Sequence, residues 1–100
     1  MDRFDELREK ILPILRSYVR RIAVFGSFAR EENTPKSDID ILVTLKPPGE
    51  RPIIGLRWFG LEEELSRLLG AQVDLVSDEA LSPYIRPYVE KELVVLYEEE

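Results

Sequence analysis

The hydrophobic and polar positions of the chain switch several times between a helical and a strand-like periodicity. Apolar residues recur at helical spacing over residues 3–19, and Pro13 inside this stretch is expected to kink or split the helix. Short runs rich in Val, Ile and Leu are typical of strands, and they occupy residues 21–25, 38–45, 72–76 and 93–97. The pattern therefore predicts a leading helix and four strands.

Two further helices are predicted between the first three strands. Ser27 is a suitable N-cap, because its hydroxyl can accept a hydrogen bond from the free N–H groups of a short helix over residues 28–32. The proline-rich residues 46–52 form a loop. Residues 54–68 then predict a longer helix, ended by Gly70, with one apolar face formed by Ile54, Trp58, Leu61, Leu65 and Leu68.

The last part of the chain predicts a short helix that begins at Ser82 and turns Ile85 and Val89 toward the core. Pro87 is unfavourable inside this helix, because proline lacks the N–H group needed for a helical hydrogen bond. Strands alternate with helices along the whole chain. This order predicts a single α/β (α+β) domain over residues 1–100, with a mixed β-sheet of about four strands flanked by helices.

Composition limits the chemistry that the chain can perform. It contains no cysteine and no histidine, which excludes disulfides, thiolate catalysis and the commonest general base. A metal ion would therefore be held by oxygen ligands, which favours magnesium, manganese or calcium over zinc. The formal net charge of −6 argues against a large nucleic-acid-binding surface, which normally needs a basic patch. No apolar stretch is long enough to span a bilayer, so we expect a cytoplasmic protein.

Three aspartates occupy unusual positions in the predicted strands. Residues i and i+2 of a strand point to the same face, so Asp38 and Asp40 lie side by side while Ile39 and Ile41 face the core. Asp74 interrupts an otherwise apolar strand. Neighbouring carboxylates repel each other and are costly to bury, and a divalent cation is the natural compensation. If the second and third strands are neighbours, the three carboxylates converge and could hold two metal ions, as in two-metal phosphoryl transfer.

Gly26 and Ser27 connect a predicted strand to a predicted helix. Such a turn is an anion site, because free N–H groups and the helix dipole favour phosphate, and glycine lets the ligand approach the backbone. A phosphate-binding turn beside a carboxylate cluster is the minimum needed to handle a metal–triphosphate complex. Taken singly, each feature also has an ordinary structural explanation, and Arg30 could be a surface charge or a partner for a carboxylate.

The spacing of these features is more specific than any one of them. Ten residues separate Ser27 from Asp38, which gives the pattern Gly-Ser-x10-Asp-x-Asp. This pattern resembles the signature of the nucleotidyltransferase superfamily that includes DNA polymerase beta. The longer stretches Gly26-Ser27-Phe28-Ala29-Arg30 and Ser37-Asp38-Ile39-Asp40 are similar to those of minimal nucleotidyltransferases, or MNT domains. Many MNT domains are antitoxins paired with HEPN-domain toxins. The resemblance covers essentially the whole chain.

The resemblance implies a metal-binding role for the three acids. In the family, the two acids of the Asp-x-Asp pattern bind both magnesium ions, and these acids correspond to Asp38 and Asp40. The third acid holds the catalytic metal ion and helps to activate the acceptor hydroxyl, and it corresponds to Asp74. The implied cofactor is therefore two Mg²⁺ ions, with Mn²⁺ as an alternative.

The resemblance also implies nucleotide-binding roles for four residues. Gly26 and Ser27 would bind the triphosphate of ATP or another nucleoside triphosphate. Arg30 would contact phosphate or brace the aspartates, and Ser37 would have a positioning role. The implied reaction moves a nucleoside monophosphate, AMP if ATP is the donor, onto an acceptor hydroxyl.

A partner protein is implied as well, because larger family members carry an extra domain that holds the base and the acceptor. We expect a second polypeptide to complete the site, and a HEPN-domain protein with a tyrosine hydroxyl as acceptor fits this expectation. The chain would then form a hetero-oligomer, or a homodimer when isolated. Residues expected either to contact a partner or to pack in the core are Trp58, Tyr84, Tyr88 and the run Leu93–Tyr97.

Three other interpretations remain open at this stage. The chain could be an antitoxin that only masks its partner, with vestigial nucleotide chemistry, although the presence of all three acids and the Gly-Ser pair favours activity. It could modify a small molecule such as an antibiotic, although its short length argues against this. It could also be an unrelated calcium- or magnesium-binding domain that matches the pattern by coincidence.

Overall fold

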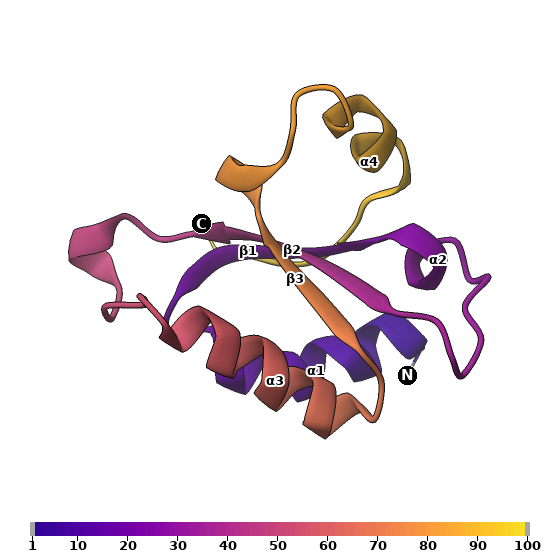
Figure 1. Cartoon of the computed structure of the whole chain (residues 1–100), viewed down its shortest axis with the longest axis horizontal. Coiled ribbons are helices and arrows are strands. Elements are labelled where there is room, and N and C mark those ends of the chain that lie inside the picture. Colours follow the sequence, from indigo (N-terminus) through magenta and orange to yellow (C-terminus); the bar gives the residue numbers. More distant parts are fainter. Residues whose placement is uncertain (1, 100) are drawn as a thin grey trace.

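A four-stranded β-sheet lies at the centre of the computed structural model, which describes residues 2–99 (Figure 1). The strand order is β3-β2-β1-β4, with β1 antiparallel to both β2 and β4, and β2 parallel to β3. The predicted four-stranded mixed sheet is therefore confirmed. Its strands are β1 (Val19–Phe25), β2 (Ile39–Leu45), β3 (Val73–Ser77) and β4 (Val94–Glu98).

Helices cover both faces of this sheet. The two long helices, α1 (Arg3–Leu15) and α3 (Arg57–Leu69), lie on one face, and the short helix α4 (Arg86–Glu92) lies on the other (Figure 1). The main core is formed between the sheet and the long helices, and its fully buried members include Ile11, Leu15, Ile22, Val24, Ile41, Val43, Leu61 and Leu65. A smaller core beneath α4 is made of Leu42, Leu81 and Val89. Among the described residues, no helix has the length and apolar content needed to cross a membrane.

Helix α1 is shorter than its apolar pattern predicts. The side chain of Asp2 caps it by accepting the Asp5 N–H at 2.8 Å, and the helix continues through Pro13 without being split. It ends at Leu15, not at residue 19, because the chain turns there and enters β1. Tyr18 nevertheless packs against the core from this turn. An apolar residue therefore occurs at the position where a continued helix would also have placed one.

Helix α2 (Gly26–Ala29) begins earlier than predicted, and the prediction that Ser27 is its N-cap is wrong. Phe25 holds the N-cap position, and Ser27 is the second residue of the helix. The reason is that Gly26 adopts a φ of 72°, which turns the chain immediately after β1. The helix then ends before residue 32, because Glu31 takes a left-handed φ of 60°.

Helix α3 ends as predicted, at Gly70 in the left-handed conformation, but it starts only at Arg57. Ile54 precedes the helix and is buried, whereas Leu68 is 48% exposed and was wrongly placed on the buried face. Leu69, the next residue, packs against the core in its place. The loop before α3 contains one 3₁₀ turn, Pro48–Glu50.

Helix α4 begins at Arg86, later than the predicted start at Ser82, and Pro87 therefore falls in its first turn. Proline is tolerated there, because the first N–H groups of a helix have no intrahelical acceptor. Val89 is buried as predicted, but Ile85 is half exposed because it precedes the helix. Strand β4 is shifted by one residue from the predicted strand over residues 93–97, so that Glu98 belongs to it.

Candidate active site

Two of the three predicted acids are direct neighbours on adjacent strands. The parallel pairing of β2 with β3 sets Asp40 beside Asp74, between the pairs Ile39–Val73 and Ile41–Leu75. The hydrophobic pairs are buried in the core against the long helices, so the two aspartates project from the opposite face of the sheet. The second and third strands are therefore neighbours, which was the condition set for the carboxylates to converge, and it brings Asp40 and Asp74 together.

Among residues 2–99, no basic side chain forms an ion pair with Asp40 or Asp74. The pKa of Asp40 is raised from 3.8 to about 6, chiefly because the side chain is partly removed from water. Repulsion and a shared hydrogen bond with Asp74 add to the shift, followed by the charges of Asp38 and Glu92. Asp40 therefore holds a proton more tightly than an ordinary aspartate, as expected of a group that needs a cation.

Asp38 lies one residue before β2 and is exposed. It is close enough to raise the pKa of Asp40, but among residues 2–99 no three acidic side chains are already gathered into a cation-binding cluster. The donors are all carboxylate oxygens, which is the ligand chemistry that Mg²⁺ and Mn²⁺ prefer. Asp40 and Asp74, with Asp38 one residue before β2, therefore fit a divalent cation by the chemistry of their donors.

The turn at Gly26 is in direct contact with this pair. A Cβ atom built on Gly26 would collide with the Oδ2 atom of Asp40, so only glycine fits at this position. Its positive φ of 72° is a second reason for glycine. The next two N–H groups, of Ser27 and Phe28, are among those that a helix leaves without an intrahelical acceptor. Backbone donors thus lie immediately beside the carboxylates.

Arg30, at the C-terminal end of α2, is held by two glutamates. Its Nη1 atom donates to Glu92 at 2.8 Å, and its Nε atom donates to Glu32 at 3.1 Å. The same Glu92 carboxylate accepts the Gly26 N–H at 2.8 Å. These hydrogen bonds from Arg30 and Gly26 lower the pKa of Glu92, with that from Arg30 the stronger cause, so Glu92 stays ionised.

Glu92 was missed at the level of sequence. It lies 66 residues away from Gly26 at the end of α4, and only the tertiary structure brings the two together.

Ser37 was predicted to have a positioning role. Its hydroxyl accepts the Thr34 N–H at 2.8 Å and so holds the turn that leads into β2. This contact agrees with a positioning role.

A cleft of about 460 Å³ opens beside the aspartates, on the side of β3. Asp40 and Asp74 form its polar wall, and Ser82 and Ile85 lie at the segment that leads into α4. The cleft is lined by Phe25, Asp40, Glu62, Asp74, Leu75, Val76, Ala80, Leu81, Ser82 and Ile85. None of the residues of α2 lines the cleft, although Phe25, the N-cap residue of α2, does.

Comparison with protein families gives a match over nearly the whole chain. Residues 6–96 match the model of the family described as the nucleotidyltransferase domain. The protein adenylyltransferase MntA of Thermococcus cleftensis is 44% identical over 89 residues, which cover 89% of this chain and 80% of that protein. The matched region contains the Gly26 turn and all three aspartates.

Solved structures with the same fold come from toxin–antitoxin complexes. One chain of a toxin–antitoxin crystal structure with AMP-PNP superposes with a TM-score of 0.77 at 25% identity, covering 93% of this chain and 74% of that chain. A chain from the complex of a tri-AMPylated HEPN toxin with its MNT antitoxin, from Shewanella oneidensis, gives a TM-score of 0.71. It is 23% identical and covers 95% of this chain and 72% of that chain, so this second likeness shows the fold alone.

Proposed function

Because this chain belongs to the nucleotidyltransferase domain family, we propose that it transfers AMP from ATP onto a hydroxyl group of a protein partner. The observation that carries the proposal is the contact between the Gly26 turn and the Asp40–Asp74 pair. Backbone donors suited to phosphate and carboxylates suited to cations meet at one point of the molecule. The relative named as a protein adenylyltransferase supports AMP as the transferred group and a protein as the acceptor.

Asp38, Asp40 and Asp74 are the residues proposed to hold two Mg²⁺ ions, or Mn²⁺ in their place. Bound divalent cations would neutralise the triphosphate, orient it and lower the pKa of an attacking hydroxyl. The raised pKa of Asp40 supports this assignment, because a bound cation would stabilise the ionised form that burial and the charge of Asp74 disfavour. In the absence of histidine, Asp74 is the proposed acceptor of the proton from the hydroxyl.

The triphosphate is proposed to lie over α2. The N–H groups of Ser27 and Phe28 and the Ser27 hydroxyl would donate to phosphate oxygens. Arg30 has several N–H donors, and those not bound to Glu92 and Glu32 would reach the same phosphates. Pyrophosphate would leave toward these donors, which stabilise the charge that develops on it.

The acceptor hydroxyl is proposed to enter through the cleft beside β3. In phosphoryl transfer the attacking and leaving oxygens are roughly in line. If pyrophosphate leaves toward α2, the acceptor would attack from a direction away from α2, and the cleft, which no residue of α2 lines, would provide this approach. Asp74 lines the cleft and is therefore placed to receive the acceptor's proton. Its apolar wall, including Leu81 and Ile85, suits an aromatic acceptor side chain such as tyrosine.

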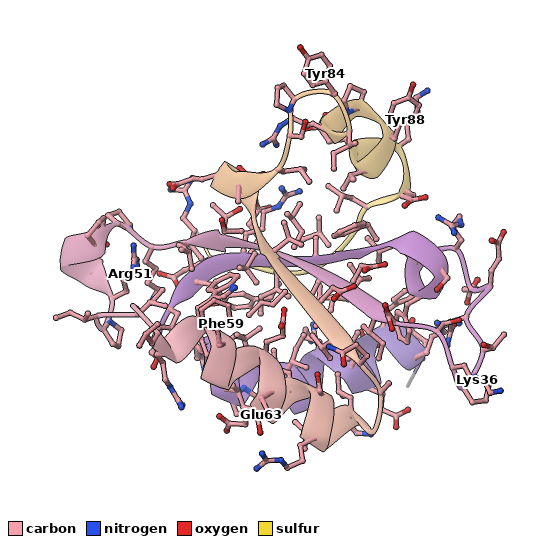
Figure 2. All side chains as sticks on the ribbon, viewed as in Figure 1. Lys36, Arg51, Phe59, Glu63, Tyr84 and Tyr88 are labelled. Atoms are coloured by element: carbon pink, nitrogen blue, oxygen red, sulfur yellow. The ribbon has the colours of Figure 1, made fainter. Side chains whose placement is uncertain are left out.

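The proposed partner is a HEPN-domain toxin that this chain inactivates as its antitoxin. The toxin–antitoxin complexes among the structural neighbours support this choice. Tyr84 and Tyr88 are 86% and 71% exposed and point outward around α4 (Figure 2). Trp58, also considered as a contact residue, instead packs against the main core, and of the run Leu93–Tyr97 only Val95 is well exposed. A hetero-oligomer is therefore proposed.

The proposal is tested by incubating the chain with its co-encoded partner, MgCl₂ and each labelled nucleoside triphosphate in turn. We expect the label of ATP to appear on the partner, and the Asp38→Asn variant to transfer none. Neutralisation of the partner in the absence of ATP, with no label transferred, would instead support a purely masking antitoxin. Label on a small molecule but not on the partner would support a small-molecule transferase.

A further inference from the structure

We propose that Glu92 is a positioning residue for nucleotide transfer, which holds the Gly26 turn and the Arg30 guanidinium in one fixed arrangement. The inference rests on the proposed function, because this arrangement matters only if α2 binds a triphosphate. Neither the aspartate pattern nor the Gly-Ser pattern includes Glu92. Its assignment comes from its contacts alone.

Both oxygens of the Glu92 carboxylate are used, and they bind the two ends of the same helix. The Oε1 atom accepts the N–H of Gly26, the first residue of α2, at 2.8 Å. The Oε2 atom accepts an N–H of Arg30, the C-cap residue of α2, also at 2.8 Å. Hydrogen bonds to an ionised acceptor are stronger than neutral ones. Glu92 is the less exposed partner of the ion pair, with 26% of its side chain exposed against 44% for Arg30.

Helix α2 depends on such contacts because it contains only four residues. A helix of this length is not stable by itself in water, so its position must be set by neighbouring elements. Arg3 fixes it from the side of α1, where its guanidinium donates to the Phe28 carbonyl at 2.9 Å and lies 4.0 Å from the Phe28 ring centroid. Glu92 fixes it from the side of α4.

Glu92 is itself well anchored. It is the last residue of α4, and two residues later the chain enters β4, where Val94 pairs with Val24 of β1. Because β1 leads directly into Gly26, the carboxylate and the turn that it binds are fixed to the same pair of strands. A side chain restrained in this way can preset the Arg30 rotamer, so that less conformational entropy is lost when phosphate binds.

If Glu92 instead competed with phosphate, its removal would have the opposite effect on nucleotide binding. Glu92 is an anion that occupies the Gly26 N–H, and it could therefore compete with a phosphate group for the same donors. If it competes, its removal strengthens nucleotide binding. If it positions the turn and Arg30, its removal weakens nucleotide binding. The sign of the effect separates the two roles.

The test compares Glu92→Ala and Glu92→Gln with the wild type and with Glu90→Gln. Glu90→Gln is a matched control, because it removes a negative charge from the same helix. The Glu90 carboxylate pairs with Arg86 and not with Arg30. The dissociation constant of a non-hydrolysable ATP analogue with Mg²⁺ is measured by calorimetry, alongside thermal unfolding. We expect Glu92→Ala to weaken binding roughly ten-fold, within the range that small misplacements of catalytic groups produce. Glu92→Gln should be intermediate, since its amide has one oxygen in place of two and its NH₂ group cannot accept a hydrogen bond from the second donor. Glu90→Gln should bind as the wild type does.

A double variant shows whether Glu92 acts through Arg30. In an Arg30→Ala background, the additional loss from Glu92→Ala should be clearly smaller than in the wild-type background. Unchanged or tighter binding by a folded Glu92→Ala variant would overturn this inference while leaving the proposed function intact. A wild-type protein that binds no nucleotide with Mg²⁺ would overturn both.

Discussion

Asp40 and Asp74 are opposite each other in the parallel β2–β3 ladder, on the face of the sheet away from the long helices. Two like charges at directly paired positions repel each other, and this repulsion adds to the burial that chiefly raises the pKa of Asp40. The surrounding core residues provide the stability that offsets it. Residues that lower stability in this way are typical of functional sites. Replacing one of them therefore tests its functional role.

Replacing one acid of the pair should stabilise the protein while removing its activity. We expect Asp74→Asn to raise the free energy of unfolding at pH 8, without divalent cations, by roughly 1 kcal/mol, the repulsion of two nearby charges in well-solvated surroundings. The same variant should transfer no nucleotide. Chemical denaturation measures the first effect. Glu79→Gln, which removes an exposed acid outside the site, should change neither quantity.

The stability of the cation-free protein should depend on pH through Asp40. Its pKa is about 6 in the folded chain and near 3.8 when unperturbed, so between these values only the folded state keeps the proton. The free energy of unfolding should therefore fall as pH rises from about 4 to about 6, and then level off. The midpoint temperature in EDTA, scanned over this window, measures the effect.

Magnesium should alter this pH profile in a defined way. The cation binds the ionised carboxylate, so the stabilisation on adding MgCl₂ should be larger at pH 7.5 than at pH 5. Asp40→Asn should lose both the fall in stability and the response to magnesium. An Asp40→Asn profile identical to that of the wild type would show that another group titrates in this window.

Gly26 should be essential to the site for a reason beyond its backbone conformation. Gly26→Ala introduces an unfavourable positive φ, costing about 1–2 kcal/mol, and also pushes a methyl group against the Asp40 carboxylate. Gly70 has a similar φ of 66° but open space around its Cβ position, so Gly70→Ala is the matched control. Both variants should lose similar stability, whereas only Gly26→Ala should lose binding of the ATP analogue.

The cleft beside β3 should be required for the acceptor and not for the nucleotide. Ile85→Arg places a charged side chain at its wall, and we expect at least a ten-fold drop in labelling of the partner with unchanged binding of the ATP analogue. Ile53→Arg is the control, because Ile53 is 94% exposed and does not line the cleft. Loss of ATP-analogue binding in Ile85→Arg would assign the cleft to the nucleoside.

The sequence was sufficient to predict a mixed sheet of four strands, because period-two patterning marks the strands, but it left open whether the second and third strands are neighbours. Asp40 and Asp74 stand out as charges within apolar strands, and Gly26 stands at the end of one. Predictions from such local patterns hold in the structure because these residues lie in regular strands or directly next to them.

The errors fall where distant contacts decide the structure. Ser27 is a good N-cap by residue type, but the Gly26 turn and its hydrogen bond to the Glu92 carboxylate determine the residue at which α2 begins. Leu68 and Ile85 have the spacing of buried residues, yet the ends of α3 and the start of α4 leave both exposed. Glu92 carries no local signal, since only the packing of α4 beside α2 gives it its partners.

The central claim, that three aspartates hold divalent cations beside a phosphate-binding turn, is tested most directly by crystallography with manganese. Crystals of the chain grown with MnCl₂ and a non-hydrolysable ATP analogue should show anomalous density for Mn²⁺ between Asp38, Asp40 and Asp74, with the triphosphate over Ser27. Manganese bound elsewhere, or a triphosphate density remote from these carboxylates, would contradict the account.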